Sequence, residues 1–159
     1  MPGSWPAGEF PYLSNATCQV TSPPTPTYNC IAWSAKEDWR WWWPDHFGIG
    51  YWPPPPVSRE ETMQAFVEAF ESLGYRLCPN GSLEVGLEKI AIFGKKNAEP
   101  DGPAAIPTHA ALQLNSGEWT SKLGAFEDIT HTTVEAVTGP TYGRPMIFMA
   151  RPRPTIPQS

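Results

Sequence analysis

The chain has 159 residues and a mass of 17.6 kDa, which is the size of one domain. It carries 11 Lys and Arg against 16 Asp and Glu, and the resulting net charge of −5 argues against a protein that binds nucleic acid through a basic surface. No run of about 18 apolar residues is present, which excludes a transmembrane helix. The first residues lack the basic and apolar regions of a signal peptide, so we expect a cytoplasmic protein.

The N-terminal part of the sequence predicts an irregular arm followed by a short helix. Residues 1–27 are rich in Pro, Ser and Thr and show no apolar periodicity, which is typical of loops. In the predicted helix at 30–42, Ile31 and Ala35 would lie on one face. Pro44 disfavours helical backbone at the residue before it, so we expect the helix to end there.

The middle of the chain predicts a loop and a longer helix. Four consecutive prolines at 53–56 favour extended polyproline backbone without internal hydrogen bonds. Residues 58–73 then carry apolar side chains at intervals of three and four, which is the pattern of an amphipathic helix. Ser58 and Glu61 form a capping box at its start, and Gly74 stands where a helix-ending glycine is expected.

The second half of the chain predicts an antiparallel sheet. Apolar runs between turn residues place strands at 89–93, 108–114, 118–122 and 144–150, with a hairpin over 108–122. Residues 126–138 predict a short helix or an irregular segment. The resulting fold class is α+β, in which N-terminal helices pack on an antiparallel sheet at 88–150. The domain would span 28–150, and the proline-rich tail at 151–159 is expected to fray.

Cys30 and His109 are the first candidates for chemistry. Cys30 stands at the predicted start of a helix, where free N–H groups and the helix dipole favour a thiolate. His109 opens an apolar strand and could serve as the base for that thiol. The residues that could orient the imidazole are Ser121, Glu118, His131 and Asp128. The alternative interpretation is a buried thiol that packs as a small apolar group, together with a hydrogen-bonded core histidine.

This arrangement resembles the papain-like cysteine peptidase superfamily. A cysteine that begins a helix, a histidine on a later strand and a polar residue on the next strand occur there in the same order. The resemblance implies that Cys30 is the nucleophile, His109 the base and Ser121 the residue that orients the ring. It also implies a papain-like α+β core and hydrolysis of an amide, peptide or related acyl bond, without a cofactor.

The sequence also resembles a family of small uncharacterised bacterial proteins over about residues 28–150. The segments that carry this resemblance are YNCIAW (28–33), EKIA (88–91), THAALQL (108–114), WTSKLG (119–124) and ITH (129–131). This second resemblance implies a shared domain but no tested activity.

The chain departs from the papain-like pattern just before the cysteine. That pattern has an upstream glutamine whose side chain helps to hold the oxyanion, whereas residues 23–27 read PPTPT. The backbone N–H of Cys30 would then need another partner, for which Asn29 and Tyr28 are the candidates. Ser121 also has a shorter side chain than the Asn or Asp usual at the orienting position. Both departures are compatible with an inactive domain.

Further side chains are candidates for a substrate cleft, namely Trp33, Trp43, Trp119, Lys122 and His131. Among them, Lys122 would place a positive charge near the thiol and lower the pKa of Cys30. A disulfide between Cys18 and Cys30 would disable the nucleophile, although a reducing compartment disfavours it. Cys78 precedes a turn and is predicted to be a structural thiol.

Two other features of the sequence offer alternatives to thiol chemistry. His46, His109 and His131 could form a zinc site with an acid or a cysteine, but no pair has the spacing of zinc ligands, so no metal is expected. Aromatic residues crowd the segment 39–52, next to the prolines at 53–56. Their rings could bind a sugar or a peptide, or they could cover the core.

The sequence therefore predicts one of two functions. The first is a cysteine hydrolase that acts on a peptide or another amide-containing substrate through Cys30 and His109. The second is a non-catalytic binding module that holds a peptide, a glycan or a partner protein through its Trp- and Pro-rich loop. Neither function involves a cofactor, a nucleic acid or a membrane.

Overall fold

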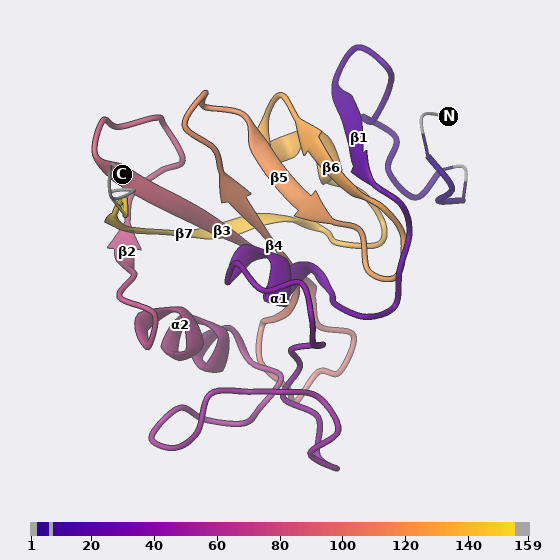
Figure 1. Ribbon diagram of the computed structural model, residues 1–159. Helices are drawn as coiled ribbons and strands as arrows, with labels where there is room; N and C mark the ends of the chain where they lie inside the picture. Colours follow the sequence, from indigo (N-terminus) through magenta and orange to yellow (C-terminus); the bar gives the residue numbers. More distant parts are fainter. Residues whose placement is uncertain (1–2, 7, 155–159) are drawn as a thin grey trace.

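The computed structural model describes residues 3–6 and 8–154, and within them the strands form one antiparallel seven-stranded sheet. In chain order the elements are β1 (Cys18–Ser22), α1 (Cys30–Ser34), α2 (Met63–Glu71), β2 (Arg76–Cys78), β3 (Leu87–Lys96), β4 (Ala105–Gln113), β5 (Trp119–Lys122), β6 (Asp128–His131), the 3₁₀ helix η1 (Val134–Val137) and β7 (Arg144–Pro152). The strands lie in the order β1-β6-β5-β4-β3-β7-β2 (Figure 1).

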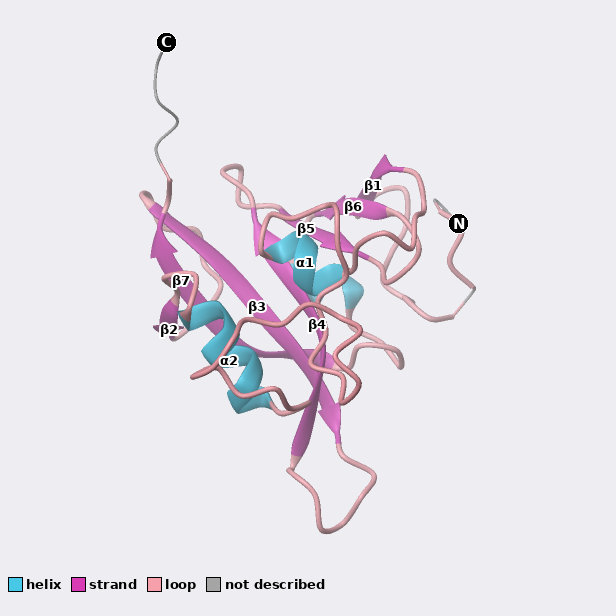
Figure 2. Ribbon diagram, turned by 60° about the horizontal axis from the view of Figure 1, so that its bottom comes forward, coloured by secondary structure: helices cyan, strands magenta, loops and turns pink. Residues whose placement is uncertain are grey.

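Both α-helices lie on the same face of this sheet. The helix α1 contacts β4 and β5, and α2 contacts β3 and β4 (Figure 2). Ile31 of α1 and Phe66 of α2 are fully buried in the core between the helices and the sheet. From the sheet, Ile90 and Ile92 of β3 point into the same core, two residues apart as strand geometry requires.

The opposite face of the sheet is covered by the N-terminal arm and by η1. Trp5 and Phe10 of the arm are buried there, together with Val137 of η1. Ala91 and Phe93, which alternate with the residues that face α1 and α2, supply the sheet side of this second core. The sheet therefore separates two cores, and a side chain's position along its strand decides which core it joins.

This architecture contradicts the expected papain-like α+β fold. The two α-helices have only five and nine residues, and the antiparallel sheet dominates the described chain. The helix expected over 30–42 ends at Ser34, and Lys36 takes a positive φ of 66°. The aromatic run beyond it consists of weaker helix formers than Ala or Leu, and Trp42 is held back against Asn29 by hydrogen bonds instead.

The helix expected over 58–73 forms in a shorter version. Its N-cap is Thr62, whose hydroxyl accepts a hydrogen bond from the backbone N–H of Ala65 at 3.1 Å. The predicted capping box is wrong, because the Ser58 N–H donates to the Glu68 carboxylate at 2.8 Å. The expected helix-ending glycine is confirmed, since Gly74 takes a positive φ of 96°.

The strand predictions at 89–93, 108–114, 118–122 and 144–150 are confirmed by β3, β4, β5 and β7, and β4 and β5 form the expected hairpin. Three short strands escaped prediction. β1 lies in the arm expected to be irregular, β6 lies within 126–138, and the two pair with each other. β2 pairs with β7, which extends to Pro152, and residues 155–159 of the predicted tail lie outside the described chain.

Candidate functional site

Cys30 is the first residue of α1, as the sequence predicts, but its side chain is buried. The helix begins there because Asn29 is its N-cap, with the side-chain oxygen accepting from the N–H of Ala32 at 3.2 Å. Burial raises the pKa of the Cys30 thiol to about 11. The backbone of Ala110 and the charge of Lys122 act in the opposite direction and do not compensate. The thiol is therefore protonated near neutral pH.

His109 lies on the other face of the sheet from α1. Its ring stacks on Tyr142 with centroids 3.9 Å apart and meets Phe93 edge-on at 5.1 Å, and both rings belong to the core beneath the arm. Cys30 packs in the core beneath α1 and α2. Because successive residues of a strand point to opposite faces, Ala110 faces α1 and His109 faces away from it. In the described chain no hydrogen bond joins Cys30 to His109.

His109 instead ends a buried chain of hydrogen bonds. Its Nε2 lies 2.9 Å from the Ser121 hydroxyl, which lies 2.9 Å from Nε2 of His131. The Nδ1 of His131 lies 2.7 Å from the carbonyl of Thr133. The predicted contact between Ser121 and the His109 ring is thus present.

The carbonyl at one end of this chain fixes the tautomers of both histidines. A carbonyl only accepts, so His131 Nδ1 carries a hydrogen and its Nε2 accepts from Ser121. The Ser121 oxygen then accepts from His109 Nε2–H, which leaves His109 Nδ1 as a bare, buried acceptor without a partner. Burial, with the charge of His131, lowers the pKa of His109 well below its usual range, and burial lowers that of His131 to about 4.

The residues expected to support an oxyanion are engaged elsewhere. The Asn29 side chain donates to the carbonyl of Trp42 at 2.7 Å and accepts from its N–H at 3.1 Å, besides capping α1. The Tyr28 hydroxyl donates to the Asp128 carboxylate at 2.5 Å. Burial, aided by Asp128, raises the pKa of Tyr28. In these positions the Asn29 and Tyr28 side chains hold the loops around α1 together.

The residues expected to line one substrate cleft are distributed over the molecule. Trp119 is buried beneath the arm, on the face away from α1. Lys122 is buried and donates to the carbonyls of Thr25 and Gly124 at 2.7 and 2.6 Å. Trp33 donates to the hydroxyl of Thr120 in β5, whereas Trp43 donates to Glu61 and packs against Phe66 of α2.

The remaining alternatives from the sequence also have a structural answer. The three cysteines, Cys18, Cys30 and Cys78, are free, so no disulfide joins the first two. Within residues 3–6 and 8–154, no three His, Cys, Asp or Glu side chains gather in a way that would hold a metal ion. In the same residues, no helix is long and apolar enough to cross a membrane.

The buried position of Cys30 predicts low reactivity. We expect iodoacetamide at pH 7.5 to alkylate Cys30 at least roughly tenfold more slowly than the half-buried Cys18 and Cys78, because the thiolate is scarce and the sulfur is covered. Peptide mass spectrometry over time measures the three rates, and in 6 M urea (roughly full unfolding) they should converge. Fastest labelling at Cys30 would contradict this prediction and would support thiol hydrolysis.

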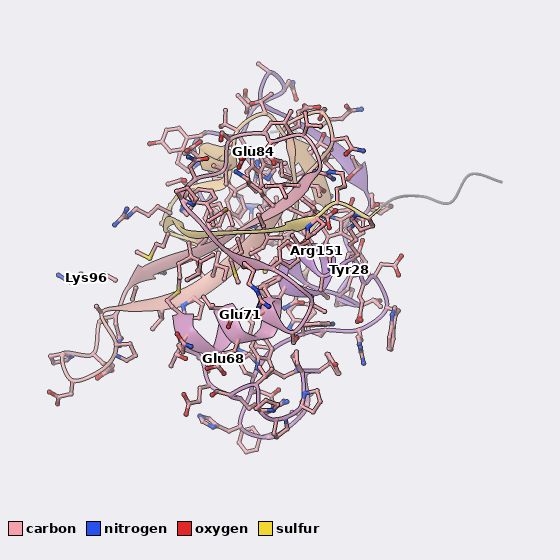
Figure 3. All side chains as sticks on the ribbon, turned by 90° about the vertical axis from the view of Figure 1, so that its left-hand side faces the viewer. Tyr28, Glu68, Glu71, Glu84, Lys96 and Arg151 are labelled. Atoms are coloured by element: carbon pink, nitrogen blue, oxygen red, sulfur yellow. The ribbon has the colours of Figure 1, made fainter. Side chains whose placement is uncertain are left out.

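The clearest concave surface near a predicted feature lies on the Trp- and Pro-rich segment, residues 39–57. A groove of ≈ 630 Å³ runs between this segment and the end of α2. Its lining consists of Trp42, Tyr51, the four prolines 53–56, Val57, Glu68, Glu71, Ser72 and Leu73. Figure 3 shows Glu68 and Glu71 on α2, beside the loops of this segment. The groove thus combines aromatic and proline surface with two carboxylates.

Side-chain hydrogen bonds help to fix the Trp- and Pro-rich segment in place. Arg59 donates to the carboxylate of Asp45 at 3.0 Å and to the carbonyl of Gly50 at 2.8 Å. The same carboxylate accepts from the N–H groups of Ile49 and Gly50. Beyond this clamp Phe47 and Ile49 are 89% and 86% exposed, so their side chains face solvent.

Sequence reasoning found the aromatic half of this groove and missed the acidic half. Glu68 and Glu71 lie on the polar side of the helix that periodicity predicts, where carboxylates are ordinarily taken as solvated. The signal that was available is that only residues 57–62 separate the prolines from α2, which keeps the proline segment near the helix.

Taken with the fold, these features define a single antiparallel-sheet domain with a sealed thiol and a surface groove. Residues 19–150 match the family described as Domain of unknown function (DUF7689), and the chain belongs to this family. No curated protein matches the chain, and no solved structure matches it.

Proposed function

We propose that the protein is a non-catalytic binding module whose groove, between residues 39–57 and α2, holds a peptide segment of a partner protein. The observation that carries this proposal is the groove itself, which joins two aromatic side chains, four consecutive prolines and two carboxylates on one concave surface. The peptide would present a basic side chain to the carboxylates and an apolar side chain to the aromatic wall.

The charge of the groove supports a basic ligand. Glu71 makes no ion pair in the described chain, and Glu68 accepts hydrogen bonds from the Ser58 N–H and from Gln64 without meeting a cation. The lining contains no Lys or Arg among the residues described. A Lys or Arg of the ligand would therefore gain attraction without displacing an existing ion pair, which favours both association rate and specificity.

The aromatic side chains of the groove suit a peptide better than a sugar. Recognition of sugars uses a flat, open aromatic face, whereas Trp42 is 2% exposed and its indole N–H already donates to Glu37 at 2.8 Å. The more exposed Trp39 has its face covered by the guanidinium of Arg40 at 4.2 Å. The prolines offer instead a stiff apolar wall, which loses little entropy of its own when an extended peptide lies against it.

Thiol hydrolysis, the other function that the sequence predicts, has less support. The Cys30 thiol is buried and its pKa is raised, and the sheet separates it from His109. A nucleophile must be reachable by substrate and within reach of its base. The two residues are better explained as parts of two different cores.

Peptide selection followed by one charge reversal tests the proposed function. A random 12-residue phage library (roughly the length that spans a peptide groove) is selected on the purified chain. We expect enriched peptides to share a Lys or Arg next to an aliphatic or aromatic residue. Isothermal calorimetry of a synthetic consensus peptide should then show at least about a tenfold loss of affinity in Glu71→Lys, because an attraction becomes a repulsion.

The matched control is Glu118→Lys, which makes the same charge change on the exposed β4–β5 turn, away from the groove. It should leave the affinity for the consensus peptide within about twofold of the parent. Equal loss in both variants would mean that net charge alone governs binding. That result, or the absence of any enriched basic motif, would overturn the proposal.

A further inference from the structure

A second cavity lies on the far side of the molecule from the Trp- and Pro-rich segment. It has a volume of ≈ 530 Å³, which is in the range of small-molecule sites. Its walls come from the N-terminal arm, from η1 and its flanks, and from the start of β7. We call it the arm pocket, and its lining includes Tyr12, Thr133, Glu135, Ala136, Thr138 and Arg144.

The walls of the arm pocket are tied together by backbone hydrogen bonds. The Thr132 N–H donates to the carbonyl of Thr17 at 2.9 Å, which joins the chain before η1 to the arm. Gly139 and Gly143 exchange hydrogen bonds of 3.1 and 2.8 Å, which fixes the turn that leads into β7. The pocket therefore exists before any ligand arrives, and binding would cost little backbone ordering.

Two opposite charges line the arm pocket without meeting. Glu135 and Arg144 are both exposed, and neither makes an ion pair or a side-chain hydrogen bond with another described residue. They also form no ion pair with each other. An unpaired guanidinium and an unpaired carboxylate on one cavity can each accept a complementary charge from a ligand.

The remaining lining supplies apolar surface and a spare polar group. The Tyr12 ring is 62% exposed, and Ala136 is buried in the lining. The Thr138 hydroxyl is one of four buried side-chain polar atoms that lack a hydrogen-bond partner in the described chain. Buried polar groups are normally satisfied, and an unsatisfied one in a cavity wall suggests a missing partner.

We propose that the arm pocket binds a small zwitterion of about dipeptide size with an apolar or aromatic side chain. Its carboxylate would pair with Arg144, its ammonium group with Glu135, and its side chain would pack on Tyr12 and Ala136. The volume of ≈ 530 Å³ leaves room for a ligand of dipeptide size. This site is separate from the groove and independent of the proposed function.

Three related ligands test the zwitterion proposal. The dipeptide Ala-Phe carries both charges, N-acetyl-Ala-Phe only the carboxylate, and Ala-Phe amide only the ammonium group. In ¹H–¹⁵N NMR titrations of the full chain we expect saturable shifts at the amides of Ala136 and Thr138. Ala-Phe should bind at least about tenfold more tightly than either single-charge ligand, since each ion pair adds to affinity.

Charge-removing variants assign the two ends of the ligand. Arg144→Gln should weaken Ala-Phe and N-acetyl-Ala-Phe and leave Ala-Phe amide unchanged, and Glu135→Gln should do the converse. Both side chains are exposed, so neither substitution threatens folding. Equal binding of the three ligands, unchanged binding in both variants, or no saturable shift up to about 10 mM (roughly the weakest affinity useful to a cell) would overturn the proposal.

Discussion

Replacing Glu88 by Gln is expected to lower the free energy of unfolding by about 3–5 kcal/mol. Glu88 is buried, with 2% exposure, and its carboxylate meets three cations. Lys36 lies at 2.6 Å, Arg151 at 2.8 Å and Arg153 at 3.5 Å. The glutamine would occupy the same volume without the charge, so three cations would stand near one another with no anion between them.

The Glu88 cluster also joins segments that are far apart in the sequence. Tyr75 donates its hydroxyl to the same carboxylate at 3.1 Å, and Arg151 reaches on to the carbonyl of Leu73 at 2.8 Å. Burial raises the pKa of Glu88, but hydrogen bonds from Lys36 and Arg151 outweigh it and keep the pKa below its ordinary value. The charged Glu88 carboxylate therefore stabilises the fold at pH values above the ordinary pKa of a glutamate. This stabilisation is lost as the pH falls through the lowered pKa of Glu88 in the folded chain.

Urea unfolding followed by tryptophan fluorescence measures the effect of Glu88→Gln. The matched control is Glu118→Gln, which removes an exposed carboxylate without a cation partner and should change stability by less than about 0.5 kcal/mol. Lys36→Gln offers an intermediate case, because Lys36 is 43% exposed and its pair should contribute only about 1 kcal/mol. If Glu88→Gln lowered the free energy of unfolding no more than Lys36→Gln does, the buried carboxylate would not stabilise the fold as argued.

The sheet could be predicted from the sequence where its strands are long and apolar. β3 and β4 contain apolar runs and pair with each other, and β4 forms a local hairpin with β5, so periodicity and turn residues were sufficient. β1 and β6 were missed because their sequences, CQVTS and DITH, are short and mostly polar. β1 becomes a strand by pairing with β6 across more than 100 residues, which no local pattern reveals, and β6 lies between β1 and β5 and pairs with both.

The candidate thiol site depends on which face of the sheet each of its residues occupies. The sequence correctly placed Cys30 at a helix start and Ser121 beside the imidazole of His109. Whether the helix packs over the face that His109 presents depends on the parity of β4, and a shift of one residue reverses it. The papain-like resemblance rests on the order of residues along the chain. That order does not determine which face of the sheet α1 covers, and this face decides whether Cys30 and His109 meet.

Lowering the pH from 7 to 5 is expected to destabilise the protein through its two buried histidines. The pKa of His131 in the folded chain is about 4, because burial disfavours its charged form. A histidine in an unfolded chain titrates near about 6.5. Between these values the unfolded chain binds more protons than the folded one, so the free energy of unfolding falls as the pH falls. For His131 alone the loss at pH 5 is about 2 kcal/mol, and His109 acts in the same direction.

Variants separate this effect from the titration of carboxylates, whose lowered pKa values act mainly below about pH 4.5. In His131→Gln the loss of stability between pH 7 and pH 5, measured by urea unfolding at each pH, should shrink by about 2 kcal/mol, even though the variant starts from a lower value. His46 is exposed, so His46→Gln should keep the parent's pH dependence.

The hydrogen-bond chain also requires that ¹⁵N spectra of the imidazoles at pH 5 show both rings neutral, with the proton on Nε2 of His109 and on Nδ1 of His131. The predicted destabilisation arises because a buried imidazole, with no solvent and no acid beside it, is hard to protonate. Charged rings at pH 5 would contradict this explanation. So would a loss of stability between pH 7 and pH 5 that is the same in His131→Gln as in the parent.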